Sequence, residues 1–373
     1  MAMDRLITLH QPSRLDIGAG AVSRVGAWAA GAARSLVITA PAVAGLVERL
    51  GLGGDVRVFS DVPPEPDDTA LAAALAVAAD FRPDLVIGLG GGSVMDVAKL
   101  VAVLWDGRQT LAEVVGPDRV AAKLSRLAQV PTTAGTGSEA GIRALITDST
   151  TNAKMAVESP LMRADLAVLD PELTWTVPAA VTAATGVDAM AHCVEAFTNR
   201  RAHDMIDGFA RMGIDLVGRY LRRAVEDGTD TEAREGMMLA SYYGGICLGP
   251  VNTAAGHALA YPLGTRLHLP HGLANAIIFP HVLAFNAPAR EAKTAEILSL
   301  LGLPDTPEPD HVLEATHGFC RDLGNEMRLS AHGAVDNALP AWAEEAHGIR
   351  RLMDNNPREM SVDDVLTIYR AAY

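Results

Sequence analysis

Cysteine, basic charge and long apolar runs are all scarce in this chain of 373 residues. Its three cysteines are too few and too scattered for a disulfide framework, which favours a reducing compartment. The net charge of −14 argues against a nucleic-acid partner, because such proteins normally present a basic face to the phosphates. The longest apolar stretch, Ala70–Ala79, falls short of the roughly 20 residues that span a membrane. Because the start, MAMDRLITLH, has no basic and then apolar signal, we expect a cytoplasmic protein with no membrane partner.

The apolar residues that are present follow the pattern of a two-domain globular protein. Hydrophobic residues make up 49% of a chain that is longer than one core usually serves. The first half alternates β-branched runs such as SLVITA with helical runs such as AVAGLVERL, and Leu85–Leu89 is apolar throughout, which is typical of buried parallel strands. Long helical patterns follow Thr176-Val177-Pro178, which indicates a helix start with proline in the first turn. We therefore expect an α/β domain with a parallel sheet over residues 1–177 and an all-helical domain over residues 178–373.

Two glycine-rich segments of the first domain have the composition of nucleotide-binding loops. GLGGGSVMDVAK, Gly88–Lys99, follows an apolar strand and opens a helix, whose free N–H groups and dipole suit a pyrophosphate. Its Ser93 stands where the strict dinucleotide fingerprint has a third glycine or alanine, and a mere tight turn is the alternative. PTTAGTGSE, Pro131–Glu139, offers hydroxyl groups for a ribose or a nicotinamide amide, although a solvated loop has the same composition. Together the two segments favour a dinucleotide.

One carboxylate and three imidazoles in the second domain have the spacing of a metal site. Asp188 and His192 are four residues apart in TGVDAMAHCVEAF, so a helix places both on one face. His257 and His271 are fourteen apart, and we expect them on one helix and on the helix or loop that follows it. A mixed oxygen and nitrogen set suits zinc or iron(II), whereas calcium and magnesium prefer oxygen throughout. Each histidine taken alone is more often structural, and only the joint pattern predicts a divalent metal.

From Leu6 to Tyr373 the chain resembles the iron-containing, or group III, alcohol dehydrogenases. The resemblance rests on motifs in one order: GGGSVMDVAK, PTTAGTGSEA, ITDSTTNAKMAV, LAVLDPELT, TGVDAMAHCVEAF, HALAYPLG, LPHGLANAIIFPHVLAFN and NNPR. It implies a dehydroquinate-synthase-like architecture, with a dinucleotide-binding α/β domain and an all-α metal-binding domain. It also implies reversible hydride transfer between NAD or NADP and a small alcohol or aldehyde. A homodimer is the default expectation for such a cytosolic enzyme.

The same resemblance assigns roles to individual residues. It implies that the divalent metal, iron(II) or else zinc, is held by Asp188, His192, His257 and His271. It gives the pyrophosphate to Gly91, Gly92 and Ser93, and the nicotinamide side to Thr132, Thr133 and Ser138. Asp96 and Lys154 match family positions near the cofactor, with a helix-capping acid and a solvated loop charge as their alternatives.

Two positions depart from the family pattern. Many relatives have a histidine four residues after the third metal ligand, where this chain has Tyr261, a poorer base at neutral pH. We expect proton exchange through Tyr261, His268 or a ribose hydroxyl of the cofactor. Relatives that prefer NAD usually carry an acid where this chain has Ala40, and its absence removes a repulsion against the 2′-phosphate of NADP.

Three other functions share parts of this pattern. A maleylacetate-reductase-like enzyme would reduce an acidic substrate, which Arg143 or Arg266 could recognise, but that branch loses the four metal ligands kept here. A dehydroquinate-synthase-like lyase would regenerate its nicotinamide within each turnover and needs more basic residues near the metal. A non-catalytic nucleotide-binding protein would not need four buried metal ligands, which are costly without a function.

Overall fold

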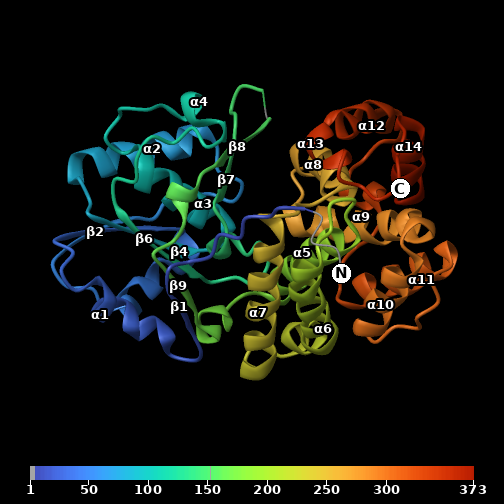
Figure 1. Cartoon of the computed structure of the whole chain (residues 1–373), viewed down its shortest axis with the longest axis horizontal. Helices are drawn as coiled ribbons and strands as arrows, with labels where there is room; N and C mark the ends of the chain where they lie inside the picture. Colours follow the sequence, from blue (N-terminus) through green and yellow to red (C-terminus); the bar gives the residue numbers. More distant parts are fainter. Residues whose placement is uncertain (1–4, 152) are drawn as a thin grey trace. The chain divides into compact units, whose positions relative to one another are not determined.

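The computed structural model describes residues 5–151 and 153–373, and it contains two compact units (Figure 1). The first, here the α/β unit, is Leu9–Thr176. The second, here the helical unit, is Val177–Tyr373 with the described part of Met1–Thr8. Asn152 of the ITDSTTNAKMAV motif and the first four residues of MAMDRLITLH, where we expected no signal sequence, lie outside the described residues.

The centre of the α/β unit is a parallel sheet, as the sequence predicts, and the sheet has six strands. Its strands in spatial order are β1 (Leu15–Ile17), β9 (Leu166–Leu169), β6 (Arg126–Pro131), β4 (Leu85–Gly90), β2 (Arg34–Thr39) and β3 (Asp55–Phe59). All six residues of β4 are buried, because the strand is covered on both faces. This burial explains why its sequence is an unbroken apolar run rather than an alternating one.

Helices cover both faces of this sheet (Figure 1). Leu36 and Ile38 of β2 pack with α2 (Asp68–Phe81) and α3 (Gly92–Leu104), while Val37 faces α1 (Val25–Ala29) on the opposite side. The AVAGLVERL run is helical as expected, but of the 3-10 type, η2 (Pro41–Leu50). A small second sheet that the sequence analysis did not predict consists of β5 (Gly116–Pro117), β8 (Lys154–Glu158) and β7 (Arg143–Thr147). The short elements of the unit are α4 (Leu111–Val114), η1 (Ala21–Arg24), η3 (Ser138–Ala140), η4 (Pro160–Met162) and η5 (Pro171–Thr174).

The helical unit has no strand among its described residues, which confirms the predicted all-α region. Its helices are α5 (Ala179–Thr198), α6 (Asp204–Glu226), α7 (Thr231–Leu248), α8 (Ala255–Leu267), α9 (His271–Asn286), α10 (Glu291–Leu300), α11 (Pro309–Asp322), α12 (Leu339–Gly348), α13 (Arg350–Met353) and α14 (Val362–Ala371), with η6 (Ala287–Ala289), η7 (Leu329–His332) and η8 (Asp336–Ala338). Pro178 is the N-cap of α5 and not a first-turn residue, so the predicted helix start was wrong by one position.

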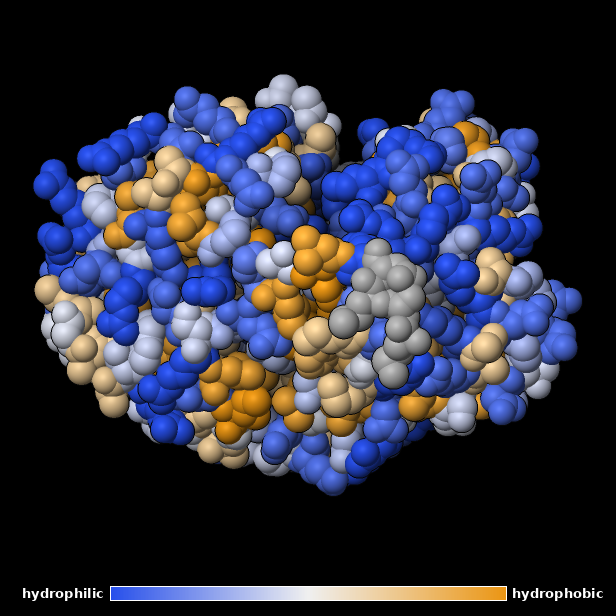
Figure 2. Space-filling view, viewed as in Figure 1, coloured by the Kyte–Doolittle hydropathy of each residue, from blue (hydrophilic) through white to orange (hydrophobic). Residues whose placement is uncertain are grey.

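The segment His271–Ala289, which is α9 with the turn after it, is long and apolar enough to cross a membrane. Single polar residues interrupt its apolar run, so it does not stand out in the sequence as one long apolar stretch. In the structure 78% of the segment is buried inside the protein, where it packs in one core with α8 and α12–α14. Hydrophilic side chains predominate over α12–α14 on the face seen in Figure 2. The hydropathy of α9 is therefore that of a core helix.

Candidate metal and cofactor sites

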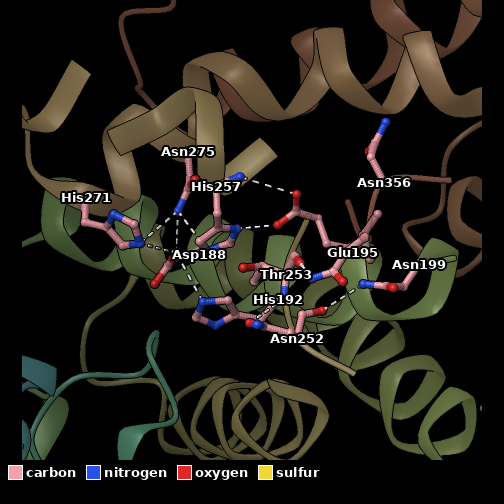
Figure 3. Close-up of polar contacts among 12 residues, drawn as sticks. Asp188, His192, Glu195, Asn199, Asn252, Thr253, His257, His271, Asn275 and Asn356 are labelled. Atoms are coloured by element: carbon pink, nitrogen blue, oxygen red, sulfur yellow. Dashed lines mark hydrogen bonds and ion pairs between the residues drawn. The ribbon is translucent and has the colours of Figure 1, made fainter. Parts of the chain in front are cut away.

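Three helices of the helical unit bring the four predicted metal ligands together (Figure 3). Asp188 and His192 lie one turn apart on α5, His257 lies in the first turn of α8, and His271 begins α9. The Oδ1 atom of Asp188 is 3.8 Å from Nε2 of His192, 3.5 Å from Nε2 of His257 and 3.6 Å from Nε2 of His271. All three imidazoles therefore present the same ring nitrogen to one carboxylate oxygen.

Close helix packing makes this convergence possible. A Cβ atom on Gly272 would lie 2.3 Å from the carbonyl oxygen of Ala184, so only glycine lets the start of α9 approach α5 so closely. The side chains of Asp188, His192 and His257 are then buried, with relative exposures of 2%, 5% and 3%. Buried ionisable groups are costly unless they are paired or bind a metal.

The geometry of this cluster fits a divalent metal. Two ligands of a tetrahedral ion that each lie about 2.1 Å from it are about 3.4 Å apart, close to the spacings between Asp188 and the three histidines. Oxygen and nitrogen donors of Asp188, His192 and His257 all lie within 4.8 Å of one another. The Nδ1 atom of His192, the ring nitrogen that does not face Asp188, is buried without a hydrogen-bond partner among the described residues.

The electrostatics of the cluster agree with a cation-binding role. Burial would raise the pKa of Asp188, but the neighbouring histidines outweigh it and hold that pKa well below its usual range. Burial lowers the pKa of His192 to about 4, so this imidazole is neutral near pH 7. Burial also opposes protonation of His257, yet Glu195 and Asp188 raise its pKa to about 10. A metal that binds at this site must therefore displace a proton from His257.

Two polar side chains that the sequence analysis missed support the cluster. Glu195 accepts a hydrogen bond from Nδ1 of His257, on the ring side opposite to Asp188 (Figure 3). Asn275 donates its amide to Oδ1 of Asp188 at 2.7 Å. A small cavity of about 20 Å³, enough for one water, lies beside Glu195 and Asn275. Glu195 could have been found from its position three residues after His192, because that spacing places it on the same helical face.

The two predicted proton carriers have different surroundings. The ring of Tyr261 lies one helical turn after His257 and is 5.8 Å, centroid to centroid, from the ring of His271. His268 is exposed and forms the C-cap of α8 in a left-handed conformation, with φ of 54°. The structure thus brings Tyr261 to the ligand cluster and leaves His268 at the end of the helix.

The two glycine-rich segments of the α/β unit lie side by side. Gly90 and Pro131 pair at the carboxyl ends of the neighbouring strands β4 and β6, and Thr132 N–H donates to the carbonyl of Gly90 at 3.0 Å. A Cβ atom on Gly92 would lie 2.7 Å from the side chain of Thr136, so the loops touch. Helix α3 begins at Gly92, and its N-cap residue, Gly91, makes no side-chain capping bond. This arrangement is the predicted strand-to-helix turn with N–H groups directed outward from the helix end.

The remaining predicted cofactor residues are distributed around these loops. Ser93 and Thr133 are partly buried and Thr132 is buried. The hydroxyl of Ser138 donates to Asp96 at 2.6 Å and accepts from Lys99 at 2.6 Å, so Asp96 and Ser138 belong to one internal network. The ammonium of Lys154 pairs with Glu65 and donates to Thr147 at 2.9 Å.

A buried lysine and a buried glutamate complete the network around Ser138, and neither was predicted as a functional residue. Lys99 is fully buried and donates to the carbonyl of Arg143 at 2.7 Å. Burial lowers its pKa, against the effect of Asp96 and Glu139. Burial raises the pKa of Glu139 to about 7, and one of its carboxylate oxygens has no hydrogen-bond partner within residues 5–151 and 153–373.

Both units of the chain match models of a known protein family. A family model described as iron-containing alcohol dehydrogenase matches residues 12–171, and its C-terminal counterpart matches residues 182–373. The long-chain-alcohol dehydrogenase 1 of Geobacillus thermodenitrificans is 37% identical over 358 residues, which cover 92% of this chain and 90% of that protein.

Solved structures agree with this match. The structure of a 1,3-propanediol oxidoreductase has a TM-score of 0.93 and 31% identity, and covers 99% of this chain and 100% of its own. That of sulfoacetaldehyde reductase from Bifidobacterium kashiwanohense in complex with NAD+ has a TM-score of 0.90 and 27% identity, with 99% of each chain covered. The chain belongs to the iron-containing alcohol dehydrogenase family, and its activity is that of an oxidoreductase that interconverts alcohols and aldehydes with a nicotinamide cofactor.

Proposed function

We propose that this protein is a metal-dependent, NAD- or NADP-linked dehydrogenase of small alcohols that also reduces the corresponding aldehydes. The single observation that carries the metal dependence is the convergence of Asp188, His192, His257 and His271 in the helical unit. We assign metal binding and substrate chemistry to residues 178–373 and cofactor binding to residues 1–177.

The metal would be held by these four side chains, and iron(II) fits the family while zinc accepts the same ligands. When bound, it supplies a Lewis acid for the substrate oxygen. The chain's own contribution is to orient the ligands, since the rings of His192 and His257 stack with centroids 4.7 Å apart. Their burial also limits the access of bulk water, which strengthens electrostatic interactions at the site.

The nicotinamide cofactor would bind at the adjoining glycine-rich segments. We assign the pyrophosphate to Gly91, Gly92 and Ser93 and the nicotinamide side to Thr132, Thr133 and Ser138, with Asp96 and Lys154 nearby. A relative of known structure was solved with NAD+, which supports this cofactor class. Ala40 at the end of β2 offers no carboxylate to repel a 2′-phosphate, so we propose that NADP is also accepted.

Tyr261 is our candidate for the group that exchanges the hydroxyl proton. Its ring lies against His271, and a phenol can both donate and accept a proton. His268, exposed at the end of α8, would serve only as a relay to solvent. We further propose that the protein acts in the cytoplasm as a homodimer, which follows the default for such enzymes.

The rival functions find less support. The arginines that could recognise an acidic substrate are engaged in ion pairs, Arg143 with Glu158 at 2.7 Å and Arg266 with Glu345 at 2.9 Å. A lyase that regenerates its cofactor would show no net change in nicotinamide absorbance, which separates it from a dehydrogenase.

The test is the initial rate of NADH and NADPH oxidation with a panel of short aldehydes. Protein would be stripped with a chelator under anaerobic conditions and then reloaded with iron(II) or zinc. We expect turnover only after reloading. Turnover that is equal before and after reloading would contradict metal dependence, and no turnover with any aldehyde would favour the lyase or an unusual substrate.

A further inference from the structure

We propose that Glu195 is a positioning residue for the metal site, acting through His257 and not as a ligand itself. The inference rests on the proposed metal site and concerns how strongly that site holds its ion. Glu195 and His257 are 62 residues apart in the sequence, on α5 and α8, and both are buried, with exposures of 6% and 3%. Their contact is therefore a feature of the tertiary structure alone.

The carboxylate of Glu195 is bound to His257 at two points. One oxygen accepts from Nδ1 of the ring, and the other accepts from the backbone N–H of the same residue at 3.3 Å. The first bond places the ring proton on Nδ1. Nε2, which lies 3.5 Å from Asp188 Oδ1 on the side of the ligand cluster, is then the nitrogen through which this ring would hold a metal. The second bond fixes the start of α8, so ring and backbone are held by one side chain.

Gly256 gives independent evidence that this contact depends on close approach. A Cβ atom at Gly256 would lie 2.7 Å from the carboxylate oxygen Oε1 of Glu195, nearer than side-chain carbons approach oxygen. Any larger residue would push the carboxylate away from His257. The sequence thus has a glycine immediately before His257, where the carboxylate of Glu195 needs room.

His192, the other buried histidine of the cluster, shows what the contact with Glu195 adds to His257. In the part of the chain that the structure describes, Nδ1 of His192 is buried and has no hydrogen-bond partner, whereas Nδ1 of His257 has a charged one. A histidine ligand whose second nitrogen donates to a carboxylate is fixed in orientation and is a stronger base toward the metal. Loss of such a partner typically weakens metal binding about 10- to 100-fold. We expect the effect of Glu195 to fall in this range.

The experiment is a Zn²⁺ titration of chelator-stripped, full-length protein in competition with a chromophoric chelator. We expect wild type to bind one equivalent, Glu195→Ala to bind about 10- to 100-fold more weakly, and Gly256→Ala to be weakened in the same direction. Glu195→Gln should be intermediate, because its amide keeps one acceptor for the two N–H groups of His257. The visible spectrum of bound Co²⁺ should change in the Glu195 variants, since the orientation of one ligand changes.

Asp207→Asn is the matched control. Asp207 is a buried carboxylate of the same unit, and its partner is Lys293 at 2.6 Å, not a metal ligand. Its replacement should leave Zn²⁺ affinity unchanged, so a general effect of losing a buried charge would be visible there.

The possible results separate the two claims. If wild type binds no Zn²⁺, the proposed metal site fails. If wild type binds one equivalent and Glu195→Ala binds within twofold of it, only the role of Glu195 fails. If Glu195→Ala does not fold, as judged by circular dichroism, Glu195→Gln and Gly256→Ala decide: wild-type affinity in both would overturn the proposal, and weakened affinity in both would support it.

Discussion

Each unit of this protein contains a buried cluster of ionisable side chains, and the two clusters obtain their positive charge differently. In the α/β unit, the ammonium of Lys99 lies among Asp96, Ser138 and Glu139, so the cation is part of the chain. In the helical unit, Asp188 and Glu195 face imidazoles, of which His192 is neutral near pH 7.

The comparison teaches which cluster contains its own cation and which can take up a metal ion instead. Buried carboxylates need a positive partner, and in the α/β unit the ammonium of Lys99 is that partner. An imidazole supplies a positive charge only while it is protonated, and in its neutral form it can be a metal ligand instead. The helical cluster is thus suited to exchange a proton for a metal ion, whereas the cluster around Lys99 holds the Ser138 loop against α3.

The largest expected effect comes from removing a ligand of the helical cluster. His271→Ala should lower metal-dependent turnover at least about 100-fold, because the Lewis acid contributes several kcal/mol to transition-state stabilisation. Binding of NADH, followed by fluorescence, should be nearly unchanged, since His271 belongs to the other unit. Loss of both turnover and NADH binding would indicate misfolding and would contradict the separation of the two roles.

Removing the internal cation of the α/β cluster should act on stability. Lys99→Met leaves the carboxylate of Asp96 without its buried partner, and we expect the free energy of unfolding to fall by about 3 kcal/mol or more. Urea denaturation measures this change. Lys123→Met is the control, because Lys123 forms a half-buried pair with Asp165, and its loss should cost about 1 kcal/mol or less. Equal effects of the two changes would argue against a special role for Lys99.

The protonation of Glu139 makes the stability of the α/β cluster depend on pH, which is a further difference between the two clusters. Burial raises its pKa in the folded protein to about 7, above the usual value of 4.5. Its contribution to the free energy of unfolding is therefore fully present below pH 4.5 and is lost as pH rises through 7. Glu139→Gln removes this titration. The variant should therefore gain about 3 kcal/mol of stability over wild type between pH 4.5 and pH 8. Denaturation at several pH values tests this, and a difference that does not vary with pH would contradict it.

The smallest expected effect concerns cofactor choice. Ala40→Asp places a carboxylate at the end of β2, where it would bond ribose hydroxyls and repel a 2′-phosphate. We expect the ratio of kcat/KM for NADPH over NADH to fall about tenfold, which corresponds to about 1.4 kcal/mol. An unchanged ratio would mean that Ala40 does not face the ribose.

Local spacing explains what could be predicted from the sequence. Asp188 and His192 are one helical turn apart, and β4 is an unbroken apolar run before its glycine turn, so both features are visible within a few residues. The contact of Glu195 with His257 spans 62 residues and depends on helix packing, which no local pattern encodes. The burial of Lys99 could not be predicted either, because a lysine at the end of a glycine-rich motif gives no sign that it will be buried.

The central claim is that one divalent metal binds among Asp188, His192, His257 and His271. The most direct measurement is anomalous X-ray diffraction at the zinc and iron absorption edges, on crystals of protein reloaded with each metal. We predict a single strong peak about 2.0 to 2.2 Å from one oxygen of Asp188 and from Nε2 of each histidine. A peak elsewhere, or no peak in protein that turns over, would contradict the account.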